Sequence, residues 1–193
     1  MPKTKDREPT PHINALGMVE FNSIAVGIEA ADAMLKVSEV ELIIAKTICA
    51  GKYICLVRGD TAAVRASVEE GRQVGAVACV DDFVIPNVHP QVFPALIASG
   101  KHPEVNAIGV IETFSAASAV LAADRAVKTA NISLMEIRMG VGLGGKSFCT
   151  LTGDVAAVRS AVEAGSMAAQ DVGLLVRKVI IPQPREEIFN ALS

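Results

Sequence analysis

The chain has 193 residues, of which 51% are apolar, and a formal net charge of −3. This length accommodates one ordinary domain or two small ones. The mildly acidic balance, without a stripe of Lys and Arg, argues against a nucleic-acid partner. The apolar runs are too short to cross a bilayer, which argues against a membrane protein.

Residues 1–15 are charged and rich in proline, and we expect them to form a flexible arm. They lack the apolar segment of a secretory signal, so the sequence predicts a soluble, cytoplasmic protein. Thiols stay reduced in that compartment. The cysteines form no CxxC or other close pair, so one chain alone offers no metal cage. They are Cys49, Cys55, Cys79 and Cys149.

Strand-forming and helix-forming patterns alternate along the first half of the chain. Ser23 is suited to cap a helix, and apolar residues follow it at helical spacing. Those residues are Ile24, Ile28, Ala31 and Leu35. Asp60 is expected to begin a second helix with a carboxylate at its positive end. Apolar segments predict strands over residues 16–21, 40–47, 53–58 and 80–85.

The second half of the chain repeats the first. One matched block is LGMVEFNSIAVGIEAADAMLK, from Leu16, over IGVIETFSAASAVLAADRAVK, from Ile108. Another is GKYICLVRGD, from Gly51, over GKSFCTLTGD, from Gly145. The repeat predicts two domains, residues 16–96 and 108–193, joined by a polar linker over 97–107. Each is expected to be an α+β unit in which helices cover a mostly antiparallel sheet. The second-half strands are expected over residues 108–113, 132–139, 147–152 and 175–181.

The stretch GVGLGGKS, residues 140–147, fits the phosphate-loop pattern G-x-x-x-x-G-K-[ST]. A phosphate loop opens directly into a helix, whose positive end holds the anion. Here FCTLTGD follows and predicts a strand, so the next helix is expected only from Asp154. We therefore interpret the stretch as a glycine-rich loop between two strands. The alternative is a nucleotide-binding, ferredoxin-like enzyme or sensor that depends on Lys146.

Short blocks recur in the same order in both halves: GIEAADAMLK, an AGK or GGK loop, VRGD with AAV, and a final VIP. In this order they resemble tandem-domain bacterial microcompartment shell proteins, over residues 16–192. The resemblance implies a non-enzymatic homotrimer that mimics a hexagonal six-domain tile and assembles with other shell proteins around enzyme cargo. It places Lys36 and Lys128 at the tile edge. The loops that it places around the central pore contain Ile48, Cys49, Ala50, Gly140, Val141, Gly142, Leu143 and Gly144.

The stretch KTICAGK, residues 46–52, is most similar to one branch of that family, the iron–sulfur shell proteins of propanediol-utilisation compartments. The resemblance implies that Cys49 binds a [4Fe-4S] cluster at the trimer axis. One thiolate cannot hold a cluster, but three related by a threefold axis can bind three of its irons. Water or an outside ligand is left for the fourth iron. The implied role is electron transfer across the shell or cluster delivery, with encapsulated redox enzymes as partners. The alternative is a plain metabolite-pore tile in which Cys49 only narrows the channel.

Other chemical groups favour structural roles. Cys55 and Cys149 align with each other on third strands and are expected in the core, as is Cys79. We expect His89 to lie in a loop or interface, because no acid or nucleophile is placed beside it. Glu20 and Glu112 occupy matched strand ends, where a domain contact is favoured over a paired carboxylate site.

Overall fold

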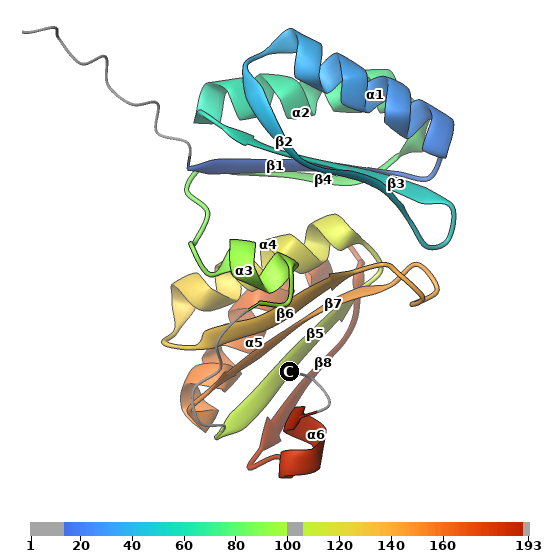
Figure 1. The fold of residues 1–193 in the computed structure, drawn as a ribbon. Coiled ribbons are helices and arrows are strands. Elements are labelled where there is room, and N and C mark those ends of the chain that lie inside the picture. The colour runs from blue at the N-terminus through green and yellow to red at the C-terminus, as the bar shows by residue number, and fades with distance from the viewer. Residues whose placement is uncertain (1–13, 100–105, 191–193) are drawn as a thin grey trace, which may run out of the picture.

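The computed structural model describes residues 14–99 and 106–190, which form two similar α+β domains (Figure 1). Domain 1 is β1 (Ala15–Phe21), α1 (Ile24–Val37), β2 (Val40–Ile48), β3 (Lys52–Gly59), α2 (Thr61–Gly75), the 3₁₀ turn η1 (Ala76–Ala78), β4 (Cys79–Ile85) and α3 (Val92–Leu96). Domain 2 is β5 (Ala107–Thr113), α4 (Ala116–Thr129), β6 (Ser133–Met139), β7 (Ser147–Gly153), α5 (Val155–Asp171), β8 (Leu175–Pro182) and α6 (Glu186–Asn190). Most of the expected N-terminal arm, and part of the expected linker, lie outside the described residues.

Each domain has a four-stranded antiparallel sheet, and the two sheets have matching strand orders, β2-β3-β1-β4 and β6-β7-β5-β8. The registers also match. Glu20 lies opposite Ile54 and Asp81 in the first sheet, and Glu112 lies opposite Phe148 and Arg177 in the second. The duplication inferred from the sequence is therefore confirmed at the level of individual strand pairs.

The expected helix caps are present, with one exception. The Ser23 hydroxyl accepts the N–H of Val26 at 3.5 Å, and the Ser115 hydroxyl accepts the N–H of Ser118 at 2.9 Å. Asp60 caps α2 by accepting the N–H of Ala62 at 2.8 Å. Asp154 makes no such bond within α5. Its carboxylate instead accepts the Asn106 side-chain amide at 3.0 Å.

The two faces of the first sheet have different neighbours. One face packs against α1 and α2, with Val19, Phe21 and Met34 in a core that belongs to domain 1. The other face carries Met18 and Phe83, which belong to a core that also includes residues of α4. Helix α4 consequently lies between the two sheets (Figure 1). The domains therefore share a continuous apolar interior.

Candidate functional site

The β2–β3 and β6–β7 loops lie next to each other at one side of the molecule (Figure 1). The backbone N–H of Cys49 donates to the carbonyl oxygen of Gly140 at 2.6 Å. In return, the N–H of Gly142 donates to the sulfur of Cys49 at 3.1 Å. The peptide bond between Cys49 and Ala50 is cis. The sequence resemblance placed both loops at one pore, and the structure brings them into direct contact within one chain.

The side chains of this loop pair differ in their exposure. Ile48 is buried against Gly140, where an added Cβ would lie 3.0 Å from the Ile48 side chain. Val141 is exposed, and Cys49 is half-buried. Gly142 has a φ of 73°, in the left-handed region that glycine adopts readily. The loops and the start of α1 line an open depression of about 390 Å³, formed by Ile24, Thr47, Ile48, Cys49, Ala50, Gly51 and Val141.

The other cysteines lie in unreactive surroundings. Cys55 and Cys149 are both fully buried, which confirms that they are core residues, and this burial raises the pKa of each thiol to about 12. Cys79 is half-buried rather than in the core. Burial and the nearby Asp82 carboxylate raise its pKa. Cys49 is therefore the cysteine that combines a loop position with access to solvent.

No group of three His, Cys, Asp or Glu side chains that could hold a metal ion occurs within residues 14–99 and 106–190 of a single chain. Cys49 has Gly140 and Gly142 as its polar neighbours, and neither brings a second ligand side chain. A metal centre at Cys49 would therefore need ligands from outside the described residues of one chain.

The contact between the domains contains a fully buried carboxylate that the sequence could only suggest. Glu20 is 0% exposed and pairs with Lys52 at 2.8 Å. Its other oxygen accepts the backbone N–H groups of Ala116 and Ala117, at 2.6 and 3.2 Å, at the start of α4. Negative charge is favourable there, because the first-turn N–H groups have no partner within the helix. Glu20 therefore caps a helix of the other domain, which confirms the domain-contact interpretation for Glu20, whereas for Glu112 it stays a prediction.

Further polar groups of domain 1 bind to α4. The Asp81 carboxylate accepts the hydroxyls of Ser115 and Ser118. The backbone N–H of His89 donates to Asp124 at 2.8 Å, which confirms an interface position for His89. The two domains therefore meet through unlike surfaces. Domain 1 contributes β4 and the segment before α3, and domain 2 contributes α4.

The two lysines expected at a tile edge end corresponding helices. Lys36 pairs with Asp32 on α1, and Lys128 pairs with Asp124 on α4. Lys36 is the more exposed of the two, at 73% against 38%. Their role at a tile edge stays a prediction.

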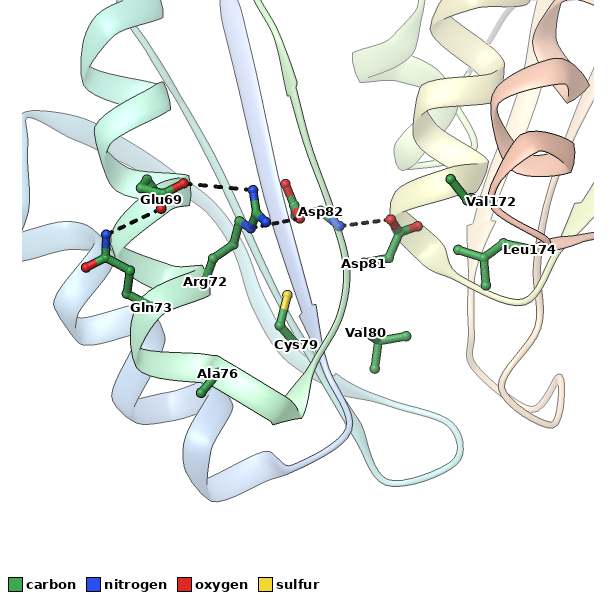
Figure 2. Close-up of a pocket in the computed structure, with 10 residues that line it drawn as sticks. All are labelled: Glu69, Arg72, Gln73, Ala76, Cys79, Val80, Asp81, Asp82, Val172 and Leu174. Carbon is green, nitrogen blue, oxygen red and sulfur yellow. Dashed lines mark hydrogen bonds and ion pairs between the residues drawn. The ribbon is translucent and has the colours of Figure 1, made fainter.

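A second depression, of about 580 Å³, separates α2 and β4 from the end of α5 (Figure 2). Arg72 lies between Glu69 and Asp82, with contacts of 3.8 and 3.3 Å. Burial raises the pKa of Asp82, and Arg72 partly offsets that effect. The acidic and basic side chains that line this depression already pair with one another, so we assign no ligand to it.

The GVGLGGKS stretch has the architecture of a loop between strands. It lies between β6 and β7, and α5 begins only at Val155. Lys146 pairs with Glu112 at 2.7 Å rather than pointing into a helix N-terminus. The phosphate-loop alternative therefore lacks the helix that it requires. Of the helices in the described part of the chain, none combines the length and apolar character needed to span a bilayer.

Comparisons with known proteins agree with the duplication. The BMC domain model matches residues 15–88 and again residues 107–184. Over 178 residues the chain is 40% identical to the bacterial microcompartment shell protein PduT of Citrobacter freundii, covering 92% of this chain and 97% of that protein. It is 31% identical to the carboxysome assembly protein CcmO of Synechococcus elongatus, covering 92% and 68%.

A solved structure shows the same arrangement. The crystal structure of a microcompartment protein from Desulfitobacterium hafniense is 54% identical and superposes with a TM-score of 0.81, covering 92% of this chain and 99% of that one. The resemblance that the sequence blocks indicated is thus confirmed along nearly the whole chain. The chain belongs to the BMC domain family, the structural, non-enzymatic shell proteins of bacterial microcompartments, and carries two copies of the domain in tandem.

Proposed function

We propose that three copies of this chain form a pseudohexagonal shell tile with one [4Fe-4S] cluster at its central axis, held by the three Cys49 thiolates. The observation that carries the proposal is the position of Cys49. Its thiol is half-buried at the point where the pore-side loops of both domains meet. The similarity to PduT over 92% of the chain supports it.

The contact between the domains supports a ring of chains. Domain 1 meets domain 2 through unlike surfaces, since Asp81 and His89 bind to α4. A contact between unlike surfaces that repeats from chain to chain closes into a ring when the rotation permits. The sequence resemblance implies a tile of six domains, and three chains supply six. Such a ring also brings the three copies of Cys49 toward one axis.

The chemistry of the loop fits an iron–sulfur cluster. Thiolates are the usual cluster ligands, and hydrogen bonds to sulfur tune the reduction potential. Cys49 already accepts such a bond from the N–H of Gly142. A bound cluster would supply one-electron transfer, which in a shell protein means electron exchange between the lumen and the cytoplasm. Gly142, which makes this bond, has no side chain to occupy the space beside the thiol, and an added Cβ there would meet no atom within 4 Å.

Purification without oxygen tests the proposal. The wild-type protein should be brown, contain about four iron ions per trimer, and give an EPR signal after reduction. Iron and acid-labile sulfide are measured on the same sample, with the trimer concentration taken from amino-acid analysis. A colourless trimer that also fails to take up iron and sulfide on anaerobic reconstitution would contradict the cluster. That result would leave a plain metabolite-pore tile.

A further inference from the structure

Helix α1 exposes apolar side chains where its counterpart α4 buries them. The two helices align residue for residue, 92 positions apart. Ile28 is 54% exposed, whereas its counterpart Val120 is 0% exposed. Ile24 and Leu35 are likewise exposed, although their counterparts Ala116 and Val127 are buried against domain 1. The α1 side of domain 1 is therefore shaped like a domain contact that no described part of its own chain covers.

Domain 2 has the complementary uncovered surface. Phe83 and Val92 of domain 1 are buried in the core shared with α4. Their counterparts on β8 and α6 are Val179 and Ile188, and both are exposed. The uncovered side of domain 2 therefore corresponds to the side of domain 1 that receives α4. A second copy of this chain, presenting α1, has the matching shape.

The ion pair beside this uncovered surface is also incomplete. Within the chain, Glu20 and Lys52 are 0% and 16% exposed, and Glu20 caps α4. Their counterparts, Glu112 and Lys146, form the same pair at 2.7 Å but are 31% and 41% exposed. In the described part of the chain, no helix start lies against Glu112. The first-turn N–H groups of α1, from Ile24 and Ala25, have no acceptor within their helix.

We propose that Glu112 caps α1 of the neighbouring subunit, as Glu20 caps α4 within the chain. Its carboxylate accepts the backbone N–H groups of Ile24 and Ala25 of the partner subunit. Lys146 corresponds to Lys52, which also donates to the carbonyl oxygens of Phe114 and Gly145. By the same correspondence, Lys146 donates to the carbonyl oxygens of Asn22 and Gly51 of the partner subunit. This intersubunit cap rests on the proposed trimer and names the residues that join its chains.

The contact of domain 1 with α4 inside a chain and the contact of domain 2 with α1 of the partner subunit are not interchangeable. This difference fixes the order of domains around the ring. Asp81 binds the hydroxyls of Ser115 and Ser118 at the start of α4. Its counterpart on β8 is Arg177, and the counterpart of Ser118 on α1 is Val26. Arg177 cannot accept these hydroxyls as Asp81 does, and the start of α4 is already bound by Glu20 and Asp81 of its own chain. Domain 2 therefore receives α1 rather than a second copy of α4.

The cap is tested by a double-mutant cycle across the interface, with the dissociation of the trimer measured by sedimentation as a function of protein concentration. E112A removes the carboxylate and should raise the dissociation concentration by about 10-fold to 100-fold. I24P removes one N–H donor at the first helical position, where proline is tolerated, so the chain should fold normally by circular dichroism. Because the two groups interact, the combined effect should be smaller than the product of the separate effects.

Two controls separate the cap from other roles of the pair. Asp60 caps α2 within domain 1, so D60A should lower stability without changing the dissociation concentration. The charge swap E112K/K146E keeps a salt bridge inside domain 2 but places a cation at the partner's helix start, so it should not restore the trimer. If E112A and I24P changed the dissociation concentration independently, or if the swap E112K/K146E restored the trimer, the proposed cap would be overturned. Wild-type protein that is trimeric but lacks iron would instead overturn the cluster and leave the cap standing.

Discussion

Replacing Glu20 by alanine is expected to lower the free energy of unfolding by about 3–5 kcal/mol, the usual cost of removing one partner of a buried ion pair. Lys52, which is 16% exposed, would lose its counter-charge. The N–H groups of Ala116 and Ala117 would lose their acceptor at the start of α4. A loss of this size is a large fraction of the stability of an ordinary protein.

Urea unfolding at a fixed protein concentration measures this effect. E20Q keeps one acceptor oxygen without the charge, so its free energy of unfolding should lie between that of the wild type and that of E20A. The matched control is E41A, because Glu41 and Arg58 form an exposed ion pair worth at most about 1 kcal/mol. If E20A and E41A proved equally stable, the domains would not be held together by the Glu20 cap.

Replacing Cys49 by serine is expected to remove the iron of the trimer completely. Serine has nearly the same size and can still accept the N–H of Gly142, so the loop should keep its shape. A hydroxyl is a poor replacement for a thiolate in a cluster. Iron content and the EPR signal of the anaerobically purified C49S protein should both fall to background, while its sedimentation shows whether the trimer persists.

C79S is the matched control for that substitution. Cys79 is also half-buried, but it lies in the depression beside Asp82 and its thiol is kept protonated by burial. The C79S protein should keep the iron content of the wild type. Equal iron in C49S and wild type would contradict the assignment of Cys49, and loss of iron in C79S alone would move the site to the other depression.

Much of the fold could be predicted because both halves carry the same local signals. The strand expected over residues 16–21 is β1, Ala15–Phe21, and the strand expected over 175–181 is β8, Leu175–Pro182. Alternating strand and helix patterns, with serine and aspartate at the helix starts, determine such elements locally. The 3₁₀ turn η1 was not predicted, because Ala76 adopts a positive φ of 44° that is unusual for alanine.

The contacts that build the site could not be predicted in the same way. Glu20 and Ala116 are 96 positions apart, and their contact depends on how two domains pack. The pairing of Cys49 with Gly142 depends on that packing too. Sequence similarity between α1 and α4 also concealed their difference in burial, since Ile28 and Val120 are both apolar. Local patterns specify each domain, whereas the surfaces between domains appear only when both are placed together.

Native mass spectrometry of the wild-type protein, prepared and sprayed without oxygen, tests the central claim most directly. The account predicts one dominant species with the mass of three chains plus a single [4Fe-4S] cluster, and this added mass should be lost on exposure to air. A species of three chains with no added mass after anaerobic reconstitution, or monomers that each carry their own iron, would contradict it.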